Sequence, residues 1–248
     1  MSSHPIRQRH PLSGFTLVEL LVACVLTMIL AVVLLGVFSN VAGTYQQIEG
    51  RTDSFREARA ALQFAAGELS QIVDVQSLAN TNSPGYSPAP PKVELDIDPD
   101  SLGGSLGFLT RLPSAVQPPN TGPSDVCLVA YFLSKPTSGE GQSLYRRLIP
   151  SKDAFARLAG GSSFFQAGDF DPAGSEALAA NVLDFRVSLK DEELQPVAST
   201  NSAAYVELEL EVIGSRAAKL YFAPGTPDAV RERLKEKEVR DFTLRWRL

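Results

Sequence analysis

The chain has 248 residues and a formal net charge of −5, with 23 lysines and arginines against 28 acidic residues. This mildly acidic balance argues against a general surface for nucleic acids or anionic lipids, because both attract basic side chains. The histidines are His4 and His10, so residues 11–248 offer no imidazole for acid–base catalysis or metal binding. The sequence lacks phosphate-loop and HExxH motifs, and its glycine-rich GGSLG segment at residues 103–107 is interpreted as a turn rather than a nucleophile elbow. We therefore expect a protein that is not an enzyme.

Residues 15–38 form the first predicted element, an apolar run with a single charge, Glu19. As a helix, the run would rise roughly 36 Å at ~1.5 Å per residue, which is enough to cross a hydrocarbon layer of ~30 Å. The alternative is a cleaved secretory signal peptide, but the run is too long for one and no small-residue cleavage site closes it. We therefore predict a transmembrane helix.

Basic residues lie close to this run on one side. Arg7 and Arg9 precede it without any acidic residue, whereas the first basic residue after it is Arg51. Basic residues stay preferentially in the cytoplasm. This distribution places residues 1–14 in the cytoplasm and the bulk of the chain outside it.

The carboxylate of Glu19 needs a partner, because an acidic side chain in hydrocarbon costs about 2.5–3.5 kcal/mol. If the chain were cut after Gly14, the α-amino group of Phe15 would be a cation. A neighbouring subunit shifted by about one helical turn would bring its own amino terminus to this Glu19. The alternative is a carboxylate that snorkels to the edge of the membrane.

The segment Gly14–Val22 reads GFTLVELLV and resembles the class III signal of type IV pilins and type II secretion pseudopilins. The resemblance implies that a prepilin peptidase cuts after Gly14 and N-methylates Phe15, and that Glu19 is the glutamate used in assembly. It also implies a single-pass protein of the inner membrane with a periplasmic ectodomain. Its expected partners are other pilin-like subunits, bound through the N-terminal helix.

The predicted helix continues beyond the membrane, without a proline before Pro84. Apolar residues recur at steps of three and four, which predicts one face packed on a globular core. The side that we expect to be solvated carries Glu49, Arg51, Asp53, Arg56, Glu57 and Glu68. A helix from residue 15 to about residue 76 would be ~90 Å long, which suits a filament subunit better than a monomeric enzyme.

Strands are predicted after a proline-rich break at residues 83–91, at 92–97, 106–110, 125–133, 143–148, 182–189, 205–213 and 242–248. Residues 205–212 read YVELELEV, so one face of this strand is apolar and the other acidic. Such alternation favours an antiparallel sheet with one face on the long helix. Residues 226–240 predict a charged surface helix, with contact to a partner subunit as the alternative.

The predicted fold is therefore α+β and pilin-like, with a long N-terminal helix packed on an antiparallel β-sheet ectodomain. We divide the chain into a cleaved leader (1–14), a transmembrane half of the helix (15–38), an extracytoplasmic half (39–82) and a β-rich head (83–248). Cys24 lies in the membrane run and Cys127 in a strand, so we expect no disulfide between them.

Further segments resemble the Verru_Chthon cassette proteins of the C type, which are pilin-like. They are FREARAAL at residues 55–62, ELSQ at 68–71, LAANV at 178–182, and PV at 196–197 leading to YVEL at 205–208. The order of LYR at residues 144–146, NV at 181–182 and a terminal strand is similar, more loosely, to J-type minor pseudopilins and W-type minor pilins. This resemblance implies a position at or near a filament tip.

One acidic cluster is a candidate calcium site. Asp96, Asp98 and Asp100 alternate along the chain, a spacing that suits an oxygen-seeking cation. The EF-hand pattern then fails, because Ser101 occupies its glycine position and Gly107 its closing glutamate position. The alternative is a solvated acidic turn. Apart from this candidate calcium ion, we expect no cofactor.

The function predicted from these features is a non-enzymatic minor pilin-like subunit of an envelope filament, such as a type II secretion pseudopilus or a type IV pilus-like assembly. The alternative is a membrane-anchored binding module, either an adhesin or a DNA-uptake pilin, that uses the signal for display. DNA binding would require clustered basic residues, and those of the head are scattered: Arg111, Arg146, Arg147, Arg245 and Arg247. We therefore expect no nucleic-acid partner.

Overall fold

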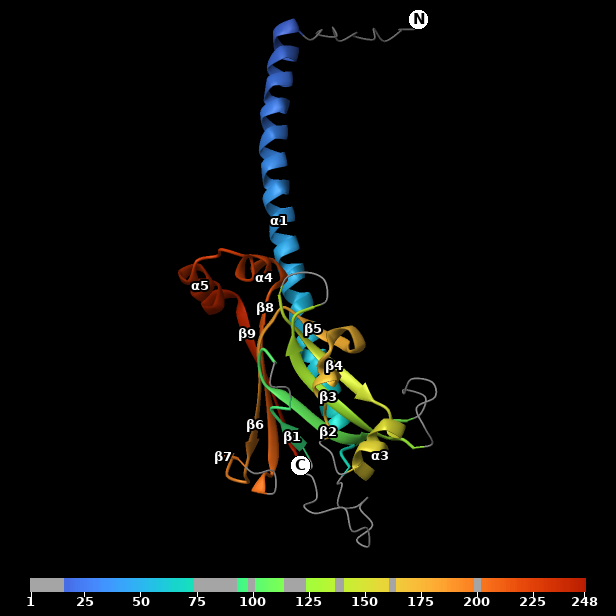
Figure 1. Cartoon of the computed structure of the whole chain (residues 1–248). Coiled ribbons are helices and arrows are strands. Elements are labelled where there is room, and N and C mark those ends of the chain that lie inside the picture. Colours follow the sequence, from blue (N-terminus) through green and yellow to red (C-terminus); the bar gives the residue numbers. More distant parts are fainter. Residues whose placement is uncertain are drawn as a thin grey trace, which may run out of the picture. The chain divides into compact units, whose positions relative to one another are not determined.

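The computed structural model describes residues 16–73, 93–97, 101–113, 124–136, 141–160, 164–198 and 202–248. The chain forms two compact units, Met1–Ile48 and Glu49–Leu248. Helix α1 (Leu17–Leu69) begins in the first unit and ends in the second, which holds all the strands (Figure 1). The α+β class with antiparallel sheets is confirmed.

In the second unit, α1 packs through a narrow stripe of small and aliphatic residues. Ala58, Ala61, Leu62, Ala65 and Leu69 are all buried and contact residues of both sheets. Their spacing of three and four places them on one face, as the sequence predicts. Alanine side chains are small, so they let a helix axis lie close to the sheets that it packs on.

The end of α1 differs from the prediction. The helix stops at Leu69 rather than continuing to residue 76 or 82, because the next residues join the sheet. Ile72 forms a bridge with Thr110, and the Val73 N–H donates to the Leu109 carbonyl at 2.8 Å. These bonds give the backbone after the helix the partners that another helical turn would otherwise supply.

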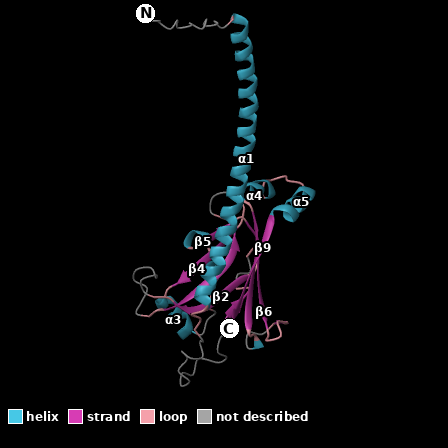
Figure 2. Ribbon diagram, turned by 180° about the vertical axis from the view of Figure 1, so that it is seen from behind, coloured by secondary structure: helices cyan, strands magenta, loops and turns pink. Residues whose placement is uncertain are grey.

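The strands form two antiparallel sheets, where the sequence predicts one (Figure 2). The five-stranded sheet has the order β1 (Val93–Leu95), β2 (Ser105–Arg111), β3 (Val126–Ser134), β4 (Ser143–Ile149) and β5 (Glu176–Ala180). The four-stranded sheet has the order β7 (Pro196–Val197), β6 (Val182–Lys190), β8 (Tyr205–Ile213) and β9 (Val239–Arg247). The seven predicted strands are confirmed, and the short strands β5 and β7 are additional.

Strand β3 is buried on both faces. Cys127, Val129 and Tyr131 face the core that contains α1, while Leu128 and Phe132 face a second core. Burial raises the pKa of the Cys127 thiol to about 12, as is typical of a cysteine that packs as a small core residue. The second core is closed by elements that the sequence does not predict: α3 (Ser151–Gly160) and the 3-10 turn η1 (Ala167–Phe170). A second 3-10 turn, η2 (Pro172–Gly174), follows and buries no residue.

Two helices separate β8 from β9: α4 (Ser215–Tyr221) and α5 (Asp228–Glu238). None of the α5 residues is buried, which confirms the predicted surface helix. The N-cap of α5 is Pro227, and the hydroxyl of the preceding Thr226 donates to the Leu220 carbonyl at 2.7 Å. Ion pairs connect α5 to the rest of the unit, one between Lys235 and Glu211 and another between Glu238 and Arg51.

Candidate functional site

The first unit contains a segment that is long and apolar enough to cross a membrane. This segment, Leu17–Ser39, has a mean hydropathy of 3.1, and none of it is buried within the protein. Leucine, valine, isoleucine and phenylalanine side chains are exposed along its whole length, from Leu17 to Phe38. An apolar surface of this extent requires cover by lipid or by other helices. The length and composition predicted for the membrane run are therefore present in the structure.

Glu19 lies in the first turn of this segment, where it closes a capping box with Thr16. The Glu19 carboxylate accepts from the Thr16 backbone N–H and from the Thr16 hydroxyl, both at 2.9 Å. In return, the Glu19 N–H donates to the Thr16 hydroxyl oxygen at 3.3 Å. The sequence TLVE contains the T-x-x-E pattern of such a box, which the sequence analysis does not use.

The geometry leaves part of the Glu19 carboxylate open to an outside group. Both bonds from Thr16 reach the same oxygen, Oε2, and both donors are uncharged. Among the described residues, none donates to Oε1. Gly14 and Phe15 lie outside the described residues, so cleavage after Gly14 and methylation of Phe15 remain predictions.

A buried cluster of charges fixes the end of α1 in the second unit. Glu68 is 3% exposed, so its predicted place on the solvated side of the helix is wrong. The Arg146 Nε donates to its carboxylate at 3.0 and 3.2 Å, and a second guanidinium nitrogen of Arg146 and the Tyr131 hydroxyl donate to it as well. These residues come from α1, β3 and β4, so the cluster joins the helix to the five-stranded sheet.

The cluster is saturated with internal partners. The Arg146 guanidinium also donates to Glu176 at 3.3 Å and lies 5.0 Å from the centre of the Phe64 ring. Burial and the charge of Glu68 raise the pKa of Tyr131 well above its usual value. Burial alone would lower the pKa of Arg146, but its bonds to Glu68 outweigh this effect and raise it. Charges so fully paired serve structure rather than catalysis.

A second group of contacts holds the start of the head part of α1. The Ser215 hydroxyl donates to the Gly50 carbonyl at 3.0 Å and lies 3.0 Å from the Ser54 hydroxyl. One residue along the helix, Arg51 Nε donates to Glu238 at 2.6 Å. The part of α1 within the second unit is therefore fixed at both of its ends, by polar contacts here and by the buried charges at Glu68.

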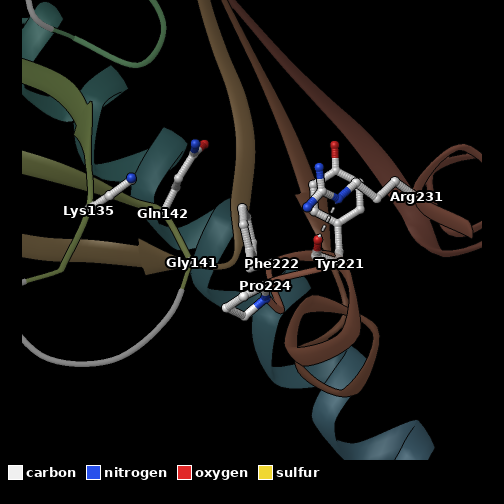
Figure 3. A pocket seen from close by; sticks show the side chains of 7 residues that line it. All are labelled: Lys135, Gly141, Gln142, Tyr221, Phe222, Pro224 and Arg231. Carbon is white, nitrogen blue, oxygen red and sulfur yellow. Dashed lines mark hydrogen bonds between the residues drawn. The ribbon is translucent and has the colours of Figure 1, made fainter. Parts of the chain in front are cut away.

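A pocket lies between the end of β3, the start of β4 and the α4–α5 connection (Figure 3). Its volume is about 470 Å³, and it is lined by Lys135, Gly141, Gln142, Tyr221, Phe222, Pro224 and Arg231. Gly141 has a φ of +109°, and a Cβ there would lie 3.3 Å from the Phe222 ring. These seven lining residues carry no carboxylate, imidazole, thiol or aliphatic hydroxyl group. They therefore offer no set of groups for acid–base or nucleophilic chemistry.

The candidate calcium site is only partly described. Asp96 is exposed and has a φ of 49°, while Asp98 and Asp100 lie outside the described residues. Groups of three histidine, cysteine, aspartate or glutamate side chains that could hold a metal do not occur among the described residues. Calcium binding at Asp96, Asp98 and Asp100 therefore stays an untested prediction.

Comparison with known proteins gives only distant similarities. No family model and no curated protein matches the chain. A chain in the crystal structure of the GspK-GspI-GspJ complex from the enterotoxigenic Escherichia coli type 2 secretion system is 8% identical. The match covers 77% of this chain and 96% of that one, with a TM-score of 0.39. The type IV-like pilin TTHA1219 from Thermus thermophilus is 12% identical over 78% of this chain and 94% of that one, with a TM-score of 0.38. Similarity at this level does not assign the chain to a family.

Proposed function

We propose that the chain is a non-enzymatic, pilin-like subunit of an envelope filament, anchored in the inner membrane by α1 and assembled through it. One observation carries the proposal: an exposed apolar segment, Leu17–Ser39, holds one carboxylate in its first turn. It follows directly on the cleavage signal that the resemblance assigns to Gly14 and Phe15. Lipid can cover the aliphatic side chains, but it offers nothing to the carboxylate.

In the proposed assembly, a prepilin peptidase removes residues 1–14 and methylates the α-amino group of Phe15. That cation then approaches the Glu19 carboxylate of a neighbouring subunit. Support comes from the capping box, which gives Glu19 two neutral donors on one oxygen and leaves the other oxygen open. Thr16 donates hydrogen bonds but carries no positive charge, so the neighbour's amino group would add the neutralisation of the carboxylate that Thr16 cannot supply.

The contacts within the second unit suit a subunit whose head is held firmly to its helix. A filament subunit must keep its head fixed to the helix that packs in the filament. The charge cluster at Glu68 and the contacts at Gly50 and Arg51 provide this attachment at both ends of the head part of α1. In this proposal the head takes its position in the filament from the helix, and no chemical step is required of it.

Mass spectrometry of the protein purified from cells with and without a prepilin peptidase tests the processing step. We expect the mature chain to begin with N-methylated Phe15 in the first strain and to retain residues 1–14 in the second. An intact Met1 in both strains, or a cut beyond residue 38, contradicts the proposal. A Gly14→Glu variant serves as the control that blocks cleavage without changing the span.

Within pilin-like proteins, we propose a minor subunit at or near a filament tip, of the Verru_Chthon C, J or W type. The segments quoted above for these resemblances support this choice. The neighbouring genes test it: an assembly ATPase and a secretin favour a secretion or pilus machine, whereas only other pilin-like genes favour the cassette type.

The second candidate function is a displayed binding module, and the pocket beside Phe222 favours it. Two of its lining residues, Lys135 and Arg231, are cationic. The DNA-uptake form of this candidate has less support. Arg146 is held by Glu68, Arg245 donates to Glu207, and Arg247 donates to Glu192 at 2.9 Å. In-cell photo-crosslinking from Val32 distinguishes the two functions, because only a filament subunit gives crosslinks to other pilin-like chains through the span.

A further inference from the structure

Strand β9 forms an open edge of the four-stranded sheet. It has nine residues, Val239–Arg247, and pairs with β8 along its whole length without a shift in register. Strand β8 is its one partner among the described strands. The Leu248 N–H donates to the Ala204 carbonyl at 2.8 Å, and backbone groups alternate between the two sides of a strand. The N–H and C=O groups of Asp241, Thr243 and Arg245 therefore point to the outer side.

The other three sheet edges are protected against pairing. Strand β1 has three residues, and β7 has two and begins with Pro196. Strand β5 has five residues and pairs with β4 through a shift in register between Leu144 and Tyr145. Short edges, bulges and prolines are common means of preventing unwanted strand addition. Strand β9 is long and regular and contains neither proline nor glycine, so it is the edge best suited to accept another strand.

The side chains of β9 indicate which types of residue an added strand would need. Phe242, Leu244 and Trp246 face the core but are only partly buried at its border, so more apolar surface can be covered there. On the opposite face, the side chains of Arg245 and Arg247 remain 44% and 70% exposed although each contacts one glutamate. The strand already paired with β9, β8, alternates apolar and acidic residues to match these two faces.

We propose that the outer edge of β9 binds an extended segment of a partner protein in which apolar and acidic residues alternate. The segment adds antiparallel to β9, with its backbone bonded to Asp241, Thr243 and Arg245. Its apolar residues extend the row of Phe242, Leu244 and Trp246, and its acidic residues face the arginines. A second copy of the chain fits less well, because its own β9 edge carries arginines on the face where acids are required. This inference goes beyond assembly through α1 and does not depend on it.

The single tryptophan of the chain, Trp246, lies on β9 and reports directly on strand addition. The full chain in detergent is titrated with a synthetic peptide of the β8 sequence, YVELELEVI, which contains no tryptophan. We expect a saturable blue shift of Trp246 emission as the ring loses contact with water. A peptide in which lysines replace the three glutamates is the control and should bind at least tenfold more weakly. A missing blue shift, or equal binding of the two peptides, overturns the proposal.

Two variants separate strand addition from other binding. Thr243→Pro removes an outward N–H that β8 does not use and should weaken binding of the acidic peptide at least tenfold, whereas Thr243→Val keeps the N–H and should bind as the natural chain does. Arg247→Glu reverses the charge of an exposed side chain whose ion pair with Glu192 is also exposed, and should weaken binding at least fivefold. Unchanged binding by Arg247→Glu, or by a Thr243→Pro variant with a natural circular dichroism spectrum, contradicts the proposal.

A separate experiment tests the alternative that two copies of the chain pair through β9. A Thr243→Cys variant in a Cys24→Ser background places a thiol at the centre of the open edge. We expect the variant to remain monomeric under mild oxidation. A disulfide dimer formed through residue 243 would show that a second copy occupies the edge and would overturn the assignment to a partner protein.

Discussion

Glu19 and Glu68 lie in the two different parts of helix α1 and have opposite surroundings. In the first unit, Leu17–Ser39 is exposed on every side, and Glu19 has only uncharged donors from Thr16. In the second unit, α1 buries one stripe, and Glu68 on that stripe is neutralised by Arg146 of the same chain. Glu68 thus has its cation within the chain, whereas no cation contacts Glu19 among the described residues. In the proposed assembly, the cation for Glu19 comes from another chain.

Removal of Glu68, the partner of Arg146 within the chain, should have the largest effect on stability. Glu68→Ala leaves the Arg146 guanidinium buried without its carboxylate, and the loss of one partner of a buried pair costs about 3–5 kcal/mol. Chemical denaturation of the full chain in detergent measures this change in the free energy of unfolding.

Asp53→Ala is the matched control on the same helix. Its ion pair with Arg56 is exposed and 3.9 Å long, so the expected cost is within about 0.5 kcal/mol. Replacing Glu68 and Arg146 together by methionine should restore much of the lost stability, because no unpaired charge then remains. Equal effects of Glu68→Ala and Asp53→Ala would remove the distinction between the two parts of α1.

The close packing of the head part gives the next largest effect. Ala61→Leu introduces a larger side chain at a buried position between helix and sheets and should lower the free energy of unfolding by about 1–3 kcal/mol. Ala60→Leu, one residue away and exposed, should change it by less than about 0.5 kcal/mol. Thermal unfolding of the two variants side by side measures the difference, and a neutral Ala61→Leu would indicate that the head is loosely held to α1.

For the membrane part, the effect should appear in assembly and not in folding. Glu19→Ala should leave membrane insertion and cleavage intact while reducing filament incorporation roughly tenfold or more, which corresponds to about 1.4 kcal/mol per tenfold. Thr16→Ala sharpens the test, because it removes the hydroxyl of the capping box but keeps the carboxylate. If Thr16→Ala impairs incorporation as strongly as Glu19→Ala, Glu19 acts as a helix cap and not as a counter-ion.

The smallest expected effect is a dependence of head stability on pH through Glu207. Hydrogen bonds from Arg245 hold the pKa of this carboxyl below its ordinary value of 4.5. A lowered pKa in the folded state means that the stabilisation is fully present above pH 4.5 and is lost as the pH falls through the folded-state pKa. Between pH 6 and pH 3, the denaturation midpoint should therefore fall less steeply for Glu207→Gln than for the natural chain. Equal slopes for the two chains would contradict a contribution from Glu207.

Much of the fold follows from local patterns. The long helix and seven strands are predictable because apolar residues recur at steps of three and four or in alternation. The division into two sheets is not, because pairing partners are set by packing between distant segments. The short strands β5 and β7 lack enough residues for a clear periodic signal.

Two residues of the buried charge cluster can be assigned to apolar faces from their spacing in the sequence. Glu68 stands three residues after Ala65 and seven after Ala61, so its spacing puts it on the buried stripe of α1. In β4, Arg146 alternates with Leu144 and Leu148, which assigns it to the same apolar face. A lone acid on one apolar face and a lone base on another suggest a buried pair, but only the tertiary structure shows that these two meet.

The distance along the chain between Glu68 and its partner has a consequence for export. The two residues are separated by 78 positions, so in the proposed export strand β4 would cross the membrane after the head part of α1. Until Arg146 emerged, docking the helix would bury an uncompensated acid at a cost of several kcal/mol. Under the proposed topology, the helix would therefore dock only after the sheet that receives it has been delivered.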